Sequence, residues 1–283
     1  MFKLAGLCLS LLITASLIAA PCTSVTIKDD REVWINGQRI IRDNFGVNSP
    51  RWSRDGQQLA YVNDFDLSSD PVTHIVVIDR AGHVVQRMPV PESARFNFVT
   101  EMGWLNPTTI WVEGHINPSV SVYEEFDLST REMKHETFGT AFAPSPDGAT
   151  LAYRDHEPHP ARPGRHPALM IDDSPVKLLD GVVVTGPLVW SSTGERLAVG
   201  VQQNKHSGVA LVTRRGMLER VSMLPVEGRP QAIAWSTDGS LLVRANIQNP
   251  TYRIDRDGAV VASTTPLRAA ALDEACRSGR ADQ

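Results

Sequence analysis

The sequence predicts an all-β protein, a single β-propeller of four-stranded antiparallel blades with five complete blades, an N-terminal hairpin and a short C-terminal helix. Three observations predict this fold. A short motif recurs, a second hairpin pattern follows each copy, and the anchors of the copies stand at positions 52, 104, 144, 190 and 235. A near-constant period of this length is typical of propeller blades.

The clearest copy of the motif covers residues 50–61, where Trp52 precedes Ser-x-Asp-Gly and a short apolar run. Glycine accepts a positive φ and aspartate bonds the nearby backbone, so the chain turns from one strand into the next. A bulky anchor ring fills the space between packed sheets. The other copies cover residues 104–112, 144–153, 190–199 and 235–243, the first of them with Asn–Pro in place of Asp–Gly.

A second hairpin follows each copy, most clearly over residues 74–85. Two hairpins make the four-stranded sheet of one blade, so we expect five blades over about residues 48–265. A further hairpin over residues 25–35 precedes them, which leaves a five- or a six-bladed ring open. Thr265 as cap and Pro266 at the first position predict a helix that continues to Ala275.

Residues 1–22 are predicted to be a signal peptide, and residues 23–283 the propeller domain. Lys3 is followed by 17 uncharged residues, a run too short and too poorly flanked for a confident membrane span. An uncleaved anchor is the alternative. We therefore expect a periplasmic or secreted protein without a membrane span in the mature chain.

Cys22 and Cys276 are the cysteines left near the two ends once Cys8 departs with the signal. In an oxidising compartment, two such cysteines favour a disulfide, and closure of the ring would bring them together. The alternatives are that Cys22 is removed, unpaired or lipidated.

Charge and motifs exclude several functions. The 28 Lys and Arg against 32 Asp and Glu leave a net charge of −4, without the basic footprint of a nucleic-acid-binding protein. The sequence has no Gly-x-Ser-x-Gly nucleophile motif and no Gly-x-x-x-x-Gly-Lys phosphate loop. We therefore assign no catalytic residue, metal ligand or cofactor, and we expect a monomer.

The copies at 50–61, 144–153, 190–199 and 235–243 resemble the TolB-type (WD-like) extracytoplasmic propeller repeats of bacteria, which carry Pro-x-Trp-Ser-Pro-Asp-Gly-x-x-Leu-Ala-Phe. By extension the resemblance covers most of the chain after residue 25. It implies a ring of six blades, sometimes five or seven, and usually a protein-binding role, which is an analogy because a fold does not fix a function.

The loops that join the two hairpins of a blade should all lie on one face of such a ring. We expect them at residues 63–74, 113–119, 154–168, 202–208 and 245–250, which hold six of the eight histidines. The longest carries four prolines and charges of both signs. Long ordered loops often carry function. The candidate binding residues on this face are His115, His156, His159, Arg162, Arg165, His166 and His206.

These observations predict a non-catalytic platform that binds another protein or a cell-envelope component. The alternative is a metal-dependent enzyme, because some propellers with similar repeats are polysaccharide lyases with histidine-bound metal. In that case, His115, His156, His159 and His206 would converge from different blades. The sequence leaves the identity of the ligand open.

Overall fold

The computed structural model describes residues 25–43, 46–63, 73–90, 98–117, 120–155, 168–246, 248–264 and 267. These residues form 22 β-strands, and within them helical backbone occurs at Leu267 alone. The rest of the predicted C-terminal helix, the signal peptide, Cys22 and Cys276 lie outside the described residues. In the described part of the chain, no helix has the length and apolar character needed to cross a membrane.

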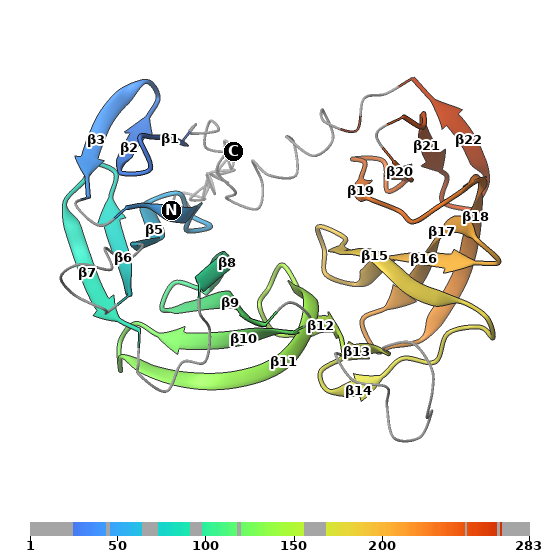
Figure 1. The fold of residues 1–283 in the computed structure, drawn as a ribbon, viewed down its shortest axis with the longest axis horizontal. Coiled ribbons are helices and arrows are strands. Elements are labelled where there is room, and N and C mark those ends of the chain that lie inside the picture. The colour runs from blue at the N-terminus through green and yellow to red at the C-terminus, as the bar shows by residue number, and fades with distance from the viewer. Residues whose placement is uncertain are drawn as a thin grey trace, which may run out of the picture.

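Antiparallel sheets follow one another around a ring (Figure 1). The first unit has three strands, β1 (Val25–Lys28), β2 (Glu32–Ile35) and β3 (Gln38–Arg42). The second unit has four, β4 (Asn48–Trp52), β5 (Gln58–Asn63), β6 (His74–Asp79) and β7 (Val84–Pro89). The fifth unit has β15 (Val183–Trp190), β16 (Arg196–Gln203), β17 (His206–Thr213) and β18 (Leu218–Glu227). The sixth unit has β19 (Ala232–Trp235), β20 (Leu241–Arg244), β21 (Thr251–Ile254) and β22 (Val260–Ser263).

The third and fourth units share one strand and form a single seven-stranded sheet. The third unit has β8 (Phe98–Asn106), β9 (Thr109–Asn117), β10 (Val120–Asp127) and β11 (Glu132–Pro144). The fourth unit continues from β11 through β12 (Leu151–Arg154), β13 (Leu169–Ile171) and β14 (Ser174–Pro175). The pairing register of β11 breaks between Thr140 and Ala143, and Ala141 has a φ of 56°. Each copy of the motif thus begins a four-stranded unit, and the predicted N-terminal hairpin is a three-stranded sheet.

The Ser-x-Asp-Gly turns form as the sequence predicts. Ser53 Oγ donates to Asp55 Oδ1 at 2.6 Å, and the same oxygen accepts from the backbone N–H of Gln57 at 3.0 Å. Gly56 has a φ of 64°, which favours glycine. The turn between β11 and β12 repeats the arrangement, with Ser145 Oγ donating to Asp147 Oδ1 at 2.6 Å.

Indole hydrogen bonds join successive units. Trp104 Nε1 donates to the carbonyl of Arg51 at 3.0 Å, and Trp190 Nε1 donates to that of Ala143 at 2.8 Å. Trp235 Nε1 donates to Val189 at 3.0 Å. In each case the acceptor lies one residue before the anchor of the preceding unit. The anchor tryptophans therefore contribute a directed bond as well as buried apolar area.

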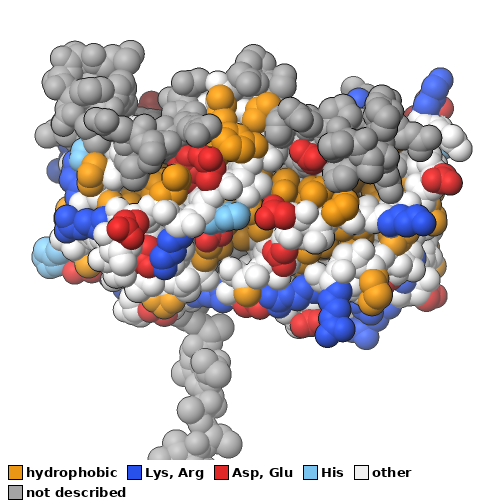
Figure 2. Space-filling model, turned by 90° about the horizontal axis from the view of Figure 1, so that it is seen from below, with side chains coloured by type: hydrophobic (Ala, Val, Ile, Leu, Met, Phe, Trp, Pro, Cys, Tyr) orange, Lys and Arg blue, Asp and Glu red, His pale blue; other side chains and the backbone are white. Residues whose placement is uncertain are grey.

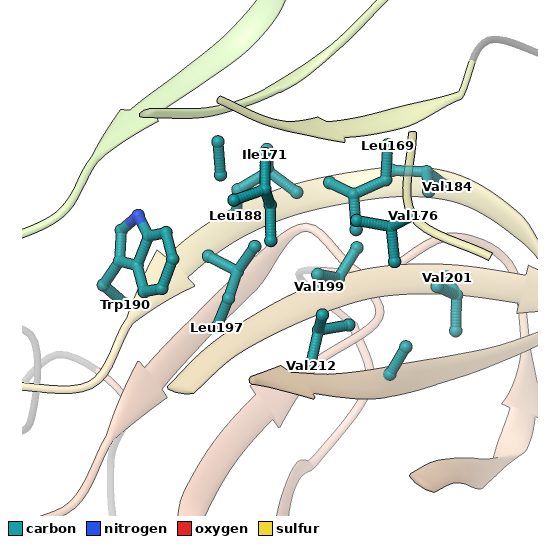
Figure 3. Packing of buried hydrophobic residues seen from close by; sticks show 12 residues of the cluster. Leu169, Ile171, Val176, Val184, Leu188, Trp190, Leu197, Val199, Val201 and Val212 are labelled. Atoms are coloured by element: carbon teal, nitrogen blue, oxygen red, sulfur yellow. The ribbon is translucent and has the colours of Figure 1, made fainter. Parts of the chain in front are cut away.

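Apolar clusters fill the space between neighbouring units. Figure 3 shows one between the fourth and fifth units, with Ile171, Leu188, Trp190 and Leu197 packed together. Burial of such side chains is the main stabilising contribution to the ring. The strands are thereby held at fixed positions, and the turns and loops at their ends can carry binding groups.

Candidate functional site

A cavity of about 320 Å³ lies between the third and fourth units, toward the Ser-x-Asp-Gly ends of the strands. Figure 2 views the ring from the side on which β10, β11 and β14 lie, where acidic side chains and a histidine accompany hydrophobic ones. The third unit contributes Tyr123, Glu125 and His135, and the fourth contributes Pro144, Gly148, Ala149, Thr150, Leu151, Tyr153, Asp172 and Asp173.

Two buried tyrosines line the cavity and donate to carboxylates of more exposed residues. Tyr123 Oη donates to Glu125 Oε1 at 3.1 Å, and Tyr153 Oη donates to Asp173 Oδ1 at 2.8 Å. Burial, aided by the neighbouring carboxylates, raises the pKa of both tyrosines above the usual value, so the phenols keep their protons. Because each phenol proton is already donated, the phenol oxygens offer acceptor positions to a ligand.

The third carboxylate of the cavity is held by the backbone. Asp172 Oδ1 accepts from the N–H of Leu151 at 2.8 Å. Asp172 and Asp173 form the two-residue turn between β13 and β14, with φ values of 45° and 60°. A turn with two positive φ values favours Asn, Asp and Gly, so the turn itself accounts for the position of this acidic pair.

Aromatic stacking holds the tyrosines that line the cavity. The ring of Tyr123 stacks on Trp111 with centroids 5.6 Å apart, and Phe142 lies 5.5 Å from its centroid. Phe142 in turn lies 5.7 Å from the ring of Tyr153. His135 Nε2 lies 2.8 Å from Thr137 Oγ1, which holds the imidazole at the wall. Both tyrosines are thus oriented before any ligand arrives.

A clamp from the fifth unit holds the turn that borders the cavity. Arg214 binds Asp147 through two nitrogens at 2.6 and 3.0 Å, and its Nε donates to Thr150 Oγ1 at 2.9 Å. The Arg214 guanidinium, together with the Ser145 hydroxyl, holds the pKa of the Asp147 carboxyl well below its usual range. Arg214 also attracts Asp172 electrostatically. Among the described residues, however, no ion pair engages Glu125, Asp172 or Asp173.

A hollow of about 470 Å³ on the sixth unit makes an instructive contrast. There Arg253 pairs with Asp238 at 2.8 Å and with Asp255 at 2.7 Å. The acidic groups of that hollow are therefore already compensated by a cation of the same unit. In the cavity between the third and fourth units, Arg214 of the fifth unit attracts Asp172, but no described ion pair joins a cation to Glu125, Asp172 or Asp173.

His115 and His206 of the predicted histidine face lie toward the ends of their strands that are opposite the Ser-x-Asp-Gly turns. His115 lies in β9, half-buried, with its Nδ1 3.4 Å from Ser121 Oγ, and His206 begins β17 and is exposed. The described residues contain no group of three His, Cys, Asp or Glu side chains that could hold a metal ion. The other predicted site residues lie outside the described ranges, namely His156, His159, Arg162, Arg165 and His166.

Two of the predicted joining loops are wrong. Residues 113–117 belong to β9, and β16 and β17 are joined by a two-residue turn at Asn204 and Lys205, with φ values of 48° and 70°. Residues 202–208 contain no Pro, and the Pro118 of the other segment comes just after the last residue of β9. The strands consequently extend into segments where we expected loops.

A polar cluster beside His115 escaped the sequence analysis. Glu113 accepts a hydrogen bond from Ser121 and pairs across the sheet with Glu101. Burial raises the pKa of Glu113 to about 7, and Glu101 adds to the shift while the Ser121 bond opposes it. Arg51 binds Glu101 at 3.4 Å. Glutamates at strand positions that face a neighbouring unit were the signal for this cluster.

Comparisons with known proteins give the fold. No family model matches the chain, and no curated protein matches it. Among solved structures, the β-propeller domain of the trilobed protease from Pyrococcus furiosus is similar over 87% of this chain and 84% of its own, with a TM-score of 0.54 and 12% identity. The fold is a β-propeller.

Two other solved structures are similar to the chain at low identity. A putative dipeptidyl aminopeptidase IV from Bacteroides ovatus has a TM-score of 0.57 and 11% identity, over 86% of this chain and 45% of its own. TolB from Acinetobacter baumannii has a TM-score of 0.46 and 15% identity, over 85% of this chain and 60% of its own. The chain thus spans under two thirds of the length of that TolB, and identities this low concern the fold alone.

Proposed function

We propose that this propeller is a non-catalytic binding platform outside the cytoplasm, which holds a partner protein of the cell envelope by a basic side chain seated in the cavity between the third and fourth units. The observation that carries the proposal is the donor and acceptor balance of the cavity. Glu125, Asp172 and Asp173 each use one oxygen on a fixed donor, and Tyr123 and Tyr153 have already donated their protons.

A ligand for such a cavity must bring donors and positive charge. A guanidinium group has five N–H donors and no acceptor, and an ammonium group has three donors. Hydrogen bonds between charged groups contribute about 1.5–3 kcal/mol each, more than neutral ones. An arginine side chain can meet the Glu125 and Asp173 carboxylates from two sides, which favours arginine over lysine.

Pre-organisation supports the same function. The aromatic stack fixes Tyr123 and Tyr153, and the Arg214 clamp holds the loop that carries Thr150. A site that is already ordered avoids the cost of ordering side chains on binding. The indole bonds between units extend this rigidity around the ring.

The test compares Nα-acetyl-arginine methylamide with its citrulline counterpart, which has the same shape and no charge. Isothermal titration calorimetry at low salt should show the arginine compound binding at least about tenfold more tightly, with affinity falling as salt rises. Asp173→Asn and Glu125→Gln should each weaken the arginine compound. Asp255→Asn is the matched control, because Arg253 already compensates that carboxylate. Equal binding of the two compounds, or of the wild type and both cavity variants, would overturn the proposal.

The metal-dependent enzyme that the sequence left open has a separate test. Elemental mass spectrometry of the purified mature protein, before and after chelation, measures bound metal directly. A stoichiometric metal lost on His115→Ala or His206→Ala would replace the platform with the enzyme. Intact mass of the exported chain would locate the cleavage near Cys22, and light scattering would check the predicted monomer.

A further inference from the structure

Two arginines approach each other at the ends of the strands that are opposite the Ser-x-Asp-Gly turns. Arg154 ends β12 in the fourth unit, and Arg229 lies in the connection from β18 to β19. Burial lowers the pKa of the Arg154 guanidinium, and the positive charge of Arg229 lowers it further. Since arginine keeps its proton in proteins, the fold holds two like charges close together, which destabilises it.

The described part of the chain does not compensate these two charges. Within it, no carboxylate forms an ion pair with either guanidinium. Arg154 Nε donates to Thr140 Oγ1 at 2.9 Å, which orients the guanidinium. Its two terminal nitrogens have no acceptor among the described groups, and the side chain of Arg229 is exposed. Both guanidinium groups can therefore donate to a ligand.

The fifth unit adds a hydroxyl group between the two arginines. Its innermost strand, β15, lies between β12 and β19 and contacts both (Figure 1). Thr185 lies near the start of β15, where the pairing with β16 shifts register between Val184 and Leu188. The Thr185 Oγ1 atom is buried and has no hydrogen-bond partner. A buried hydroxyl without a partner is rare in folded proteins and indicates an absent ligand group or water.

Close backbone packing brings Arg229 to this hydroxyl. A Cβ on Gly186 would lie 2.6 Å from the carbonyl oxygen of Pro230, so a glycine is needed for the two chains to approach this closely. Gln202 Nε2 donates at 2.7 Å to the carbonyl of the residue before Arg229 and holds the connection in place. Thr185 and Arg229 each precede one of the two residues in contact, and they are thereby brought to the same level of the ring.

Arg154 lies at that level too and faces the fifth unit. Arg154 and Gly200 each stand three residues beyond the strand residue that pairs with the anchor of their unit. Gly200 packs on Gly186, because a Cβ on Gly200 would lie 2.7 Å from the Gly186 Cα. Ala152 packs against side chains of the fifth unit, and side chains two residues apart on a strand share a face. Arg154 therefore points toward the segment that carries Thr185.

We propose that Arg154, Thr185 and Arg229 bind a phosphate group at this end of the ring. A phosphate monoester carries about 1.5 to 2 negative charges at pH 7 and three strong acceptor oxygens. Guanidinium groups bind phosphate through paired hydrogen bonds, and the Thr185 hydroxyl donates to a remaining oxygen. A carboxylate has one acceptor oxygen fewer, so phosphate matches donors from three units better. The bound anion compensates both charges and gives the buried hydroxyl its acceptor.

The test is isothermal titration calorimetry of the full chain with inorganic phosphate at constant ionic strength. Arg154→Gln and Arg229→Gln should each weaken phosphate binding at least about tenfold, as expected for loss of a hydrogen bond between charged groups. Arg196→Gln is the matched control and should bind as the wild type does, because Arg196 already pairs with Glu219 at 3.2 Å. Equal affinity of the wild type and both site variants would overturn the proposal.

A second titration with glycerol 1-phosphate distinguishes two sources of the phosphate group. Tighter binding than that of inorganic phosphate supports a site for esterified phosphate, such as a lipid headgroup carries. Tighter binding of inorganic phosphate supports a site for the free ion. A wild type that shows saturable binding of neither compound would refute the phosphate site.

Thr185→Val separates binding from folding, because it keeps the shape of the side chain and removes the hydroxyl. In phosphate-free buffer, Tm of the variant should equal or exceed that of the wild type, since a buried polar group without a partner is removed. Added phosphate should raise Tm of the wild type more than that of the variant. A lower Tm of the variant without phosphate, together with an unchanged response to phosphate, would mean that the hydroxyl serves the fold alone and would contradict the proposal.

This inference goes beyond the proposed function and can fail without it. The cavity that holds a basic side chain lies toward the other ends of the strands, between the third and fourth units. Arg229→Gln should therefore bind the arginine compound as tightly as the wild type does. Loss of arginine binding in this variant would contradict the separation of the two sites.

Discussion

Substitution of Trp190 tests whether the indole bonds hold neighbouring units together. Trp190 is 5% exposed, packs in the cluster of Figure 3 and donates to Ala143 at 2.8 Å. Trp190→Ala removes a buried aromatic ring, which costs about 3–5 kcal/mol. Trp190→Phe keeps most of the apolar area but leaves the Ala143 carbonyl without its donor, at a cost of about 1–3 kcal/mol.

Urea denaturation monitored by circular dichroism measures the free energy of unfolding of both Trp190 variants. In a chain of this size, 1 kcal/mol corresponds to about 2–4 °C in Tm, so the alanine variant should melt roughly 10 °C below the wild type. Trp34→Phe is the matched control, because Trp34 Nε1 donates at 2.9 Å to Glu32 of its own strand. If Trp190→Phe costs no more than Trp34→Phe, or if Trp190→Ala leaves Tm unchanged, the indole bonds do not hold neighbouring units together.

Three further predictions concern single positions. Gly148→Ala should lower the free energy of unfolding, measured in urea, by more than about 1 kcal/mol, because φ is 71° and a Cβ would lie 2.6 Å from the Leu105 carbonyl oxygen. Gly37→Ala is the control: its φ is 80° but the space around it is open, so it measures the backbone strain without the clash. Arg214 lowers the pKa of Asp147 in the folded state, which stabilises the fold above the unfolded carboxyl pKa and is lost as the pH falls. Arg214→Gln should remove this contribution, so Tm of the variant should fall less than that of the wild type below about pH 4. Parallel Tm curves for the two proteins would contradict this. The pKa of Glu113 is raised from 4.5 in the unfolded chain to about 7 in the folded one, so its contribution to stability is complete below pH 4.5 and is lost as the pH rises to about 7. Glu113→Gln should remove this pH-dependent loss of stability. Identical Tm profiles from pH 4 to 8 would exclude that role.

The repeat could be predicted because its signals act within about ten residues of the chain. Ser53, Asp55 and Gly56 build one turn with bonds among themselves, and the Trp52 anchor marks the end of the strand before it. The same local logic failed at Asn204 and Lys205. A two-residue turn with positive φ needs no Gly or Pro, so its strands were read as a loop.

The cavity could not be predicted because its parts come from two units. Tyr123 and Tyr153 lie on different copies of the repeat, and the Phe142 ring between them joins the two. The adjacent Asp172 and Asp173 were a visible signal, but their meaning depends on the tyrosines that pack behind them. The histidines drew attention to the opposite face, of which His115 and His206 are described and do not meet in a metal site.

The shared strand β11 has a mechanical consequence. Residues 132–139 of this strand pair with β10 and residues 140–144 pair with β12, so tension passes from one ladder to the other with no loop between them. A chain stretched from its ends should release the fifth unit, residues 183–227, as a step of roughly 150 Å. Residues 98–175 should come free in close succession over roughly 260 Å, because loss of one ladder transfers the load directly along β11 to the other.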